Sequence, residues 1–204
     1  MRILLLAISF ALFAIPSFAQ DSSGRAQVIE QINRYFNELV HLQGRFTQID
    51  AKGHRRDGAF YLQRPGRIRF EYFPRGSLTV VANGKSVNIA EEQFPDSIQR
   101  YPLEQTPLAF LLADNIDIER NAEILGFYQE TDKILLHLRD NKRSEKGEIT
   151  LVFDQPALTL RQWIITDPQG RKTLVRLSQL IEGIPIDQQL FTLETPQQTR
   201  QGKQ

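Results

Sequence analysis

The sequence contains no cysteine among its 204 residues. This absence excludes disulfide bonds and thiol nucleophiles, so the fold must be held together by packing. A bacterial lipid anchor would need a cysteine directly after a leader, so we expect no acyl group on this chain. Charge of one sign is also lacking, because 25 lysines and arginines face 24 aspartates and glutamates. The balance argues against a nucleic-acid partner, and we interpret the basic cluster His54-Arg55-Arg56 as a solvated turn.

Sequence patterns typical of catalysis are scarce as well. The three histidines, His41, His54 and His137, are scattered, and none has a metal-ligating neighbour at useful spacing. There is no nucleophile elbow, no phosphate-binding loop and no dinucleotide glycine pattern. The sequence therefore predicts neither an enzyme nor a cofactor or metal site.

A long apolar run occurs at the N-terminus. Arg2 precedes the apolar stretch Ile3–Ile15, and the small residues Ser17 and Ala19 follow. This pattern predicts a cleaved signal peptide over residues 1–19. The run is shorter than the about 20 residues that a transmembrane helix needs, although an uncleaved anchor is the alternative. We expect an exported, soluble protein of residues 20–204, which is enough for one domain with a sizeable core.

Two helices are predicted in the mature chain. Apolar residues that include Val28, Ile32 and Phe36 recur at helical spacing and predict an amphipathic helix over residues 24–41. A second helix is predicted over Pro107–Asp114, where proline suits the first helical position. This segment is apolar almost all round. Its pattern alone favours a core plug over a cover for the concave face of a sheet.

The remaining segments alternate with a period of two, which predicts antiparallel strands. Two strands flank the turn at Pro65-Gly66, and their apolar face includes one arginine. The residues on that face are Phe60, Leu62, Arg64, Ile68, Phe70 and Tyr72. Further strands are expected over residues 78–82, 86–90, 124–130, 134–139, 148–154, 158–166 and 171–181. The short links between them predict one strongly bent antiparallel sheet or an incomplete barrel.

Several segments together resemble a known family. Leu42–Gln48, Gly58–Tyr72 and Thr106–Leu112 resemble, in order and spacing, the periplasmic outer-membrane lipoprotein carriers of the LolA family. Asn83-Gly84-Lys85 and Asp187–Leu193 fall in the expected places. The likeness covers nearly the whole mature chain.

The resemblance implies a mainly β fold, an unclosed antiparallel barrel covered by a lid of helices, with an apolar cavity between them. The helix that carries Val28, Ile32 and Phe36 and the helix Pro107–Asp114 would then be parts of the lid rather than a plug. The residues expected to line the acyl-chain cavity are Phe60, Leu62, Ile68, Phe70, Tyr72, Leu108, Leu111 and Leu112.

The same resemblance implies a function. Members of the family accept triacylated lipoproteins from an inner-membrane ABC transporter and carry them through the periplasm to an outer-membrane receptor. We expect the chain to do this as a monomer. The resemblance also implies that Arg64 bonds to the lid in the empty state, whereas its sequence context alone equally fits an exposed arginine beside a turn. Ile68 departs from the aromatic residue that the family usually carries at this point.

Three other hypotheses remain open at this level. One is a sensor domain on the same half-barrel that binds acylated ligands and controls a protease. Another is the membrane-anchored acceptor itself, against which the lack of cysteine near residue 20 argues. The last is a periplasmic carrier of glycolipid, glycerolipid or another lipid, which the sequence does not separate from a lipoprotein carrier.

Overall fold

The computed structural model describes residues 20–91, 93–94, 97–141 and 147–193. The predicted signal peptide, residues 1–19, lies outside the described residues. In the described part of the chain, no helix is long and apolar enough to cross a membrane.

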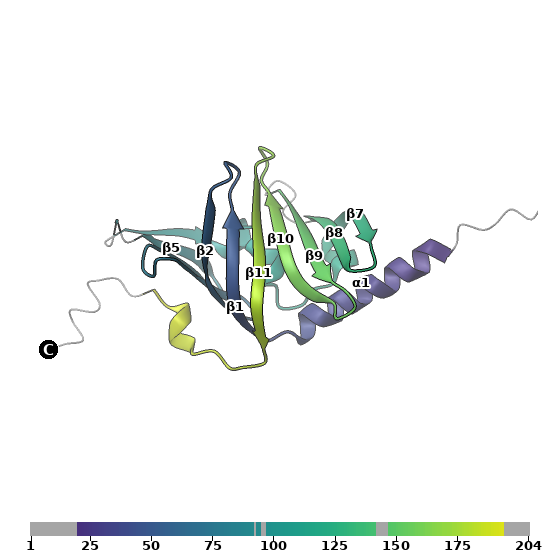
Figure 1. Ribbon diagram of the computed structural model, residues 1–204, viewed down its shortest axis with the longest axis horizontal. Coiled ribbons are helices and arrows are strands. Elements are labelled where there is room, and N and C mark those ends of the chain that lie inside the picture. The colour runs from purple at the N-terminus through teal and green to yellow at the C-terminus, as the bar shows by residue number, and fades with distance from the viewer. Residues whose placement is uncertain (1–19, 92, 95–96, 142–146, 194–204) are drawn as a thin grey trace, which may run out of the picture.

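Eleven antiparallel strands form a single sheet in the order β6-β5-β4-β3-β2-β1-β11-β10-β9-β8-β7 (Figure 1). The strands are β1 (His41–Ile49), β2 (Arg55–Gln63), β3 (Arg67–Tyr72), β4 (Leu78–Asn83), β5 (Ser86–Glu91), β6 (Ile98–Pro102), β7 (Ala122–Gln129), β8 (Lys133–Asp140), β9 (Glu148–Asp154), β10 (Thr159–Thr166) and β11 (Lys172–Glu182). Pairing of β1 with β11 joins two meanders, while β6 and β7 form the two ends of the order. The predicted fold class, a mainly β, unclosed antiparallel half-barrel covered by helices, is confirmed.

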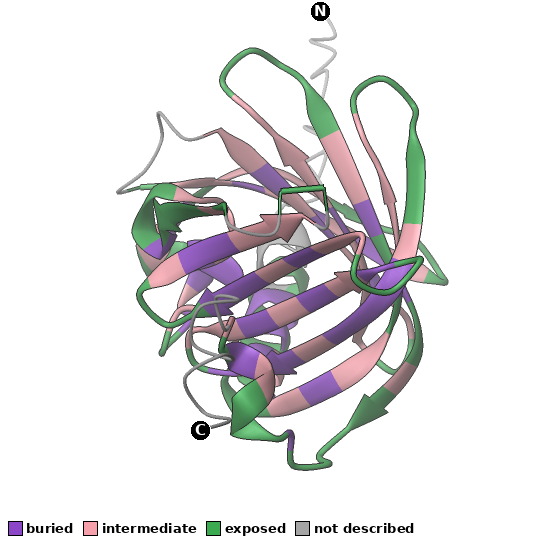
Figure 2. Cartoon of the chain, turned by 90° about the vertical axis from the view of Figure 1, so that its left-hand side faces the viewer, coloured by how far each residue is buried: buried purple, intermediate pink, exposed green. Residues whose placement is uncertain are grey.

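The alternation of the sequence becomes alternation of burial across this sheet, as the banding in Figure 2 shows. In β8, Ile134, Leu136 and Leu138 are fully buried while the residues between them are half-buried. Curvature comes from register shifts in three strand pairs. Gly58 permits close packing where β2 passes Phe46, because a Cβ at this position would lie 2.4 Å from the Phe46 ring.

Helices cover the concave face. The first, α1 (Gln20–Glu38), lies beside β7, β8 and β9 (Figure 1). It was predicted over residues 24–41, but it ends earlier because β1 already begins at His41. The second, α2 (Leu108–Leu111), is a single turn within the predicted segment Pro107–Asp114. A third helix, α3 (Ile118–Asn121), was not predicted from the sequence, and its first turn is capped by the Asp117 side chain.

Within the described residues there are also two short 3-10 helices, η1 (Leu103–Gln105) and η3 (Gln188–Phe191). The C-terminal segment that contains η3 crosses the convex face of the sheet. There Ile186 and Phe191 pack against Val81, which points outward from β4 and is fully buried. The main core is separate from this cluster and lies between the concave face and the helices.

Candidate functional site

The candidate site is an apolar space between the sheet and the two helices α1 and α2. We call it the closed interior. Its lining residues come from α1, α2 and both halves of the sheet: Phe36, Leu39, Leu42, Phe60, Leu62, Arg64, Ile68, Leu108, Leu111, Leu112, Leu160, Trp163 and Leu177. All but Arg64 are apolar or aromatic, so the arrangement is suited to hydrocarbon and offers no catalytic constellation.

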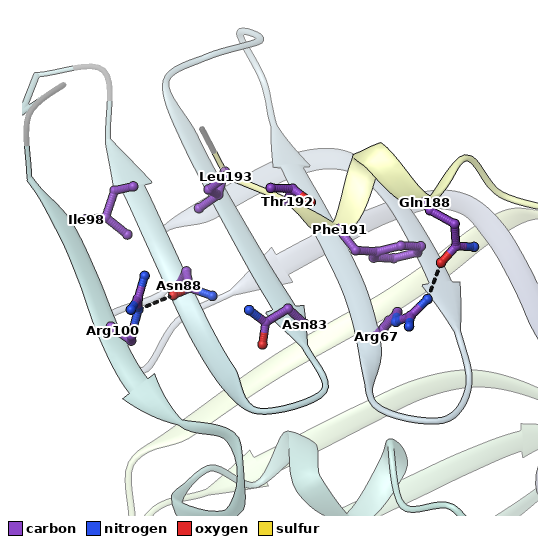
Figure 3. Close-up of a pocket in the computed structure, with 9 residues that line it drawn as sticks. All are labelled: Arg67, Asn83, Asn88, Ile98, Arg100, Gln188, Phe191, Thr192 and Leu193. Carbon is purple, nitrogen blue, oxygen red and sulfur yellow. Dashed lines mark hydrogen bonds between the residues drawn. The ribbon is translucent and has the colours of Figure 1, made fainter. Parts of the chain in front are cut away.

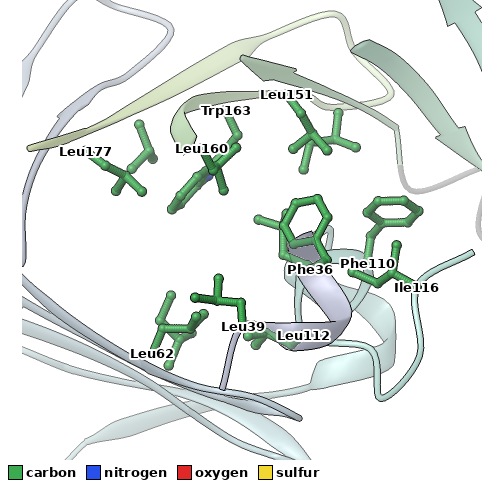
Figure 4. Packing of buried hydrophobic residues seen from close by; sticks show 14 of the residues in the cluster. Phe36, Leu39, Leu62, Phe110, Leu112, Ile116, Leu151, Leu160, Trp163 and Leu177 are labelled. Atoms are coloured by element: carbon green, nitrogen blue, oxygen red, sulfur yellow. The ribbon is translucent and has the colours of Figure 1, made fainter. Parts of the chain in front are cut away.

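The free volume of the closed interior is about 20 Å³. That is little more than the room one water molecule occupies. Figure 4 shows the apolar side chains that face one another across this space, with Trp163 and Leu177 on the sheet side and Leu39 and Leu112 opposite them. The open hollow expected from the sequence is therefore not found. Its lining residues lie close together, and this packing is favourable because apolar surface left in water costs about 25 cal/mol per Å².

Most of the predicted cavity residues meet here, and some do not. Phe60, Leu62, Ile68, Leu108, Leu111 and Leu112 line the closed interior, as does Phe36 of the predicted lid helix. Val28 and Ile32 are buried in the same core without lining it. Phe70 and Tyr72 instead pack their rings edge-to-face on Phe46, each with 5.0 Å between centroids.

The contribution of β10 and β11 to the site was not predicted from the sequence. Leu160 and Trp163 both face inward although they are three residues apart, which strict alternation forbids. A register shift between Leu160 and Gln162 places one extra residue in β10 and turns Trp163 to the same side. A bulge of this kind has no clear signature in a single sequence, so the pattern alone could not find this pair.

Arg64 closes the site on the side of the hairpin that joins β2 and β3. Its side chain is 7% exposed, and its Nη2 donates a 2.5 Å hydrogen bond to the carbonyl oxygen of Ala113, just after α2. The Gly66 amide donates to the Leu112 carbonyl at 2.9 Å, so the same turn holds α2 twice. The guanidinium also lies 5.8 Å from the centre of the Phe36 ring. The alternative of an exposed arginine beside a turn is wrong.

Burial has an electrostatic consequence for Arg64. Desolvation lowers the pKa of its guanidinium to about 10, while the nearby Asp114 carboxylate opposes the shift. The side chain therefore stays charged at neutral pH. Its Nε has no hydrogen-bond partner within the part of the chain that the structure describes. An incompletely bonded buried cation is held less firmly than a fully satisfied one.

A second polar contact ties the helical elements to one another. Asn37 of α1 donates from Nδ2 to the carbonyl of Ile116 and accepts from the amide of the same residue, both at 2.8 Å. Asn33, one turn earlier, accepts from the amide of Ile118 at 3.0 Å. The Asn37 bonds join α1 to the segment between α2 and α3, and the Asn33 bond joins α1 to the first residue of α3. We call α1, α2, α3 and the connecting segment 112–117 the lid.

A polar pocket of about 480 Å³ lies outside the closed interior, on the convex face (Figure 3). Its arginines are already engaged, Arg100 through Nε with the Asn88 oxygen at 2.9 Å and Arg67 with the Gln188 oxygen. Its wall ends at Leu193, the last described residue. We assign no function to it.

Comparison with known proteins now bears on this geometry. The family model described as outer membrane lipoprotein carrier protein LolA matches residues 37–194. The chain belongs to the LolA family. LolA proteins are carriers, and the match spans all eleven strands and the short helices that close the interior.

Individual relatives agree with the assignment. An outer-membrane lipoprotein carrier protein from Alkalilimnicola ehrlichii is 26% identical, over 95% of this chain and 90% of its own length. One from Methylococcus capsulatus is also 26% identical, over 91% of this chain and 93% of its own. A crystal structure of an uncharacterized conserved protein from Thermus thermophilus superposes with a TM-score of 0.50. It is 13% identical and covers 84% of this chain and 96% of its own, which supports the fold alone.

Proposed function

We propose that this protein is a periplasmic carrier that takes up the acyl chains of lipoproteins between its lid and its sheet. The observation that carries the proposal is the closed interior of a LolA family member, lined almost entirely by apolar side chains and shut by few polar bonds. Cargo would be received from an inner-membrane ABC transporter and passed to an outer-membrane receptor. The carrier would act as a monomer and without catalysis.

The physical need for such a carrier is large. Each methylene group removed from water contributes about 0.8 kcal/mol, and three long acyl chains have roughly 40 methylenes. Leaving them exposed would cost on the order of 30 kcal/mol, so free diffusion of a triacylated protein through an aqueous compartment is excluded. An apolar interior solves this problem if it can open.

Opening must come from the lid, because the closed interior has no room for a chain. Acyl chains would replace lid side chains against the concave face, so that apolar contact is exchanged rather than lost. The hydrogen bonds from Arg64 and Gly66 to the end of α2 must break first. Stability of this closed state lowers the apparent affinity for cargo by the fraction of protein that is open. We propose that Arg64 acts as the latch of the lid and keeps that affinity moderate enough for release.

Mass spectrometry of molecules that co-purify with the protein from a periplasmic extract tests the proposed cargo. We expect triacylated lipoprotein. Recovery of glycolipid or glycerolipid alone would favour the alternative of a carrier for another lipid. Recovery of no acylated molecule from an extract that contains released lipoprotein would contradict both.

A binding measurement with a matched pair of variants tests the location of the site. Leu108 and Leu190 are both half-buried leucines on short helices, but only Leu108 lines the closed interior. Leu108→Gln should weaken binding of a diacylated cysteinyl peptide, whereas Leu190→Gln on the convex face should leave it unchanged. Equal affinities in the two variants would place the acyl chains elsewhere.

A further inference from the structure

The indole N–H of Trp163 is a polar group inside the closed interior that makes no hydrogen bond within the described residues. Trp163 lies on β10 and is 3% exposed. Figure 4 shows its side chain directed from the strand toward the space between sheet and lid, next to Leu160 and Leu177. Its ring and that of Phe70 pack edge-to-face with 6.3 Å between centroids.

An orphan donor of this kind calls for an explanation. More than about 90% of buried polar groups in proteins are hydrogen-bonded, and a buried tryptophan usually finds a partner for its N–H. The side chains that line the interior provide no acceptor, because all but Arg64 are hydrocarbon or aromatic and the Arg64 guanidinium has donors only. Phenylalanine would fill much of the same space without bringing an unsatisfied donor into it. The N–H therefore carries a cost in the empty protein that a ligand with an acceptor would remove.

We propose that the Trp163 Nε1–H donates to the carbonyl oxygen of one of the ester or amide groups that link the acyl chains to the cargo. This inference rests on the proposed function and deepens it. Hydrocarbon tails contain no acceptor, and the linking carbonyl is the acceptor nearest to them. Being neutral, the indole can bind a carbonyl without leaving a charge to compensate. The contact fixes how deep the chain enters and makes the interior selective for acyl chains over alkyl ether chains.

The single tryptophan of the chain makes the contact directly observable. Protein isotope-labelled at the indole nitrogen gives one indole N–H signal in NMR spectra. Two probes are compared: a cysteinyl peptide that bears a dipalmitoyl-glyceryl group, and its dihexadecyl ether analogue, which has the same tails without ester carbonyls. We expect the indole proton to move downfield with the ester probe and to lack this hydrogen-bond shift with the ether probe.

Affinities provide a second readout that does not depend on the spectrum. Trp163→Phe should weaken binding of the ester probe by about 2- to 10-fold, the range of one net neutral hydrogen bond, and leave the ether probe nearly unchanged. Phe60→Leu is the matched control, because Phe60 lines the same interior without a donor. This control should weaken both probes alike.

The outcomes distinguish the proposed Trp163 hydrogen bond from the proposed carrier function. Equal indole shifts and equal affinities for the two probes would overturn the hydrogen bond while leaving acyl-chain binding intact. An indole proton that is already downfield in the empty protein and does not move would show a water-bonded group, and would overturn it too. Failure of both probes to bind would overturn the Trp163 hydrogen bond together with the proposed function. The NMR measurement uses the wild-type chain, so it stands even if Trp163→Phe does not fold.

Discussion

The sheet and the lid are held in place by different forces. In the sheet, neighbouring strands pair over five residues or more, and every strand in the order is hydrogen-bonded to the next. In the lid, α2 and α3 have four residues each, far below the length at which an isolated helix is stable. These short helices depend on apolar burial and on a few side-chain bonds from Asn33, Asn37 and Arg64.

This difference explains how a molecule with no open hollow can serve as a carrier. The ladder of the sheet can persist while the lid moves, because few bonds cross between them. Asparagine bonds link α1 to segment 112–117, so we expect the lid to move as one unit rather than helix by helix. Lid and sheet should therefore respond differently to substitution and to pH.

The largest effect is expected where the two regions share a contact. Phe36 of α1 and Phe153 of β9 meet edge-to-face at 5.8 Å, and both are almost fully buried. Phe153→Ala should lower the free energy of unfolding in urea by about 3–5 kcal/mol. Phe36→Ala should cost less in global stability and act mainly by speeding amide hydrogen exchange in the lid. Equal global losses, with no selective exchange in the lid, would mean that lid and sheet unfold as one.

Alkaline pH provides the next comparison, since each region has a tyrosine shielded from solvent, Tyr35 half-buried in the lid and Tyr72 buried in the sheet. Burial raises the pKa of Tyr35 in α1 and of Tyr72 in β3 to about 12. Both hydroxyls stay protonated in the folded chain at a pH where the unfolded chain ionises. The contribution of each tyrosine to the free energy of unfolding is therefore full below pH 10. It is lost as the pH rises toward 12, and the loss is roughly 3 kcal/mol for each tyrosine.

Urea unfolding at pH 9 and near pH 12 checks this loss. Tyr72→Phe should flatten the alkaline decline of global stability, and Tyr35→Phe should act more on exchange in the lid. Arg64 works in the opposite direction, because its lowered pKa of about 10 makes the folded state gain stability as the pH rises above 10. If neither substitution reduced the alkaline decline in the free energy of unfolding, these tyrosines would not be its cause.

The sheet is also easier to predict from the sequence than the contacts between the sheet and the lid. Strict alternation in 67–72 predicts β3 because one face of that strand is buried, and burial imposes a period of two. β6 escapes prediction, since an edge strand with mostly exposed residues carries no such period. The face of Arg64 is predictable from spacing, but its acceptor, the Ala113 carbonyl, lies 49 residues away and depends on how the chain folds back.

The closed state of the site is the part that no pattern reveals. Apolar side chains on two facing surfaces predict equally a filled core and a hollow, because both satisfy the same period. A filled core and a hollow differ only in the volume between the two facing surfaces. That volume depends on the distance between the lid and the sheet. Trp163 illustrates a related limit, because a single-residue bulge decides which face it occupies.

A smaller effect is expected from the Arg64 hydrogen bond, one of the contacts that join the lid to the sheet. Arg64→Leu removes the bond to Ala113 and leaves an apolar side chain in the interior, so the closed state loses stability relative to the loaded one. Affinity for a diacylated cysteinyl peptide should rise about tenfold, and transfer to an acceptor should slow by a similar factor. Arg176→Leu on the outer face of β11 is the control and should change neither. Wild-type rates of release from the Arg64 variant would exclude the latch.

The smallest effect concerns bonds within the lid, and it shows whether the lid is one unit. Asn37→Ala removes two hydrogen bonds to Ile116, whereas Asn33→Ala removes one to Ile118. With about 0.5 kcal/mol for each partly buried bond, the first variant should cost about 1 kcal/mol and the second about half of that. If the lid moves as a unit, hydrogen exchange should speed up for amides of α1 and of segment 112–117 together in both variants, in proportion to these costs. Faster exchange confined to the substituted turn would instead show that each helix opens alone, and cargo would then enter past one helix rather than under the whole lid.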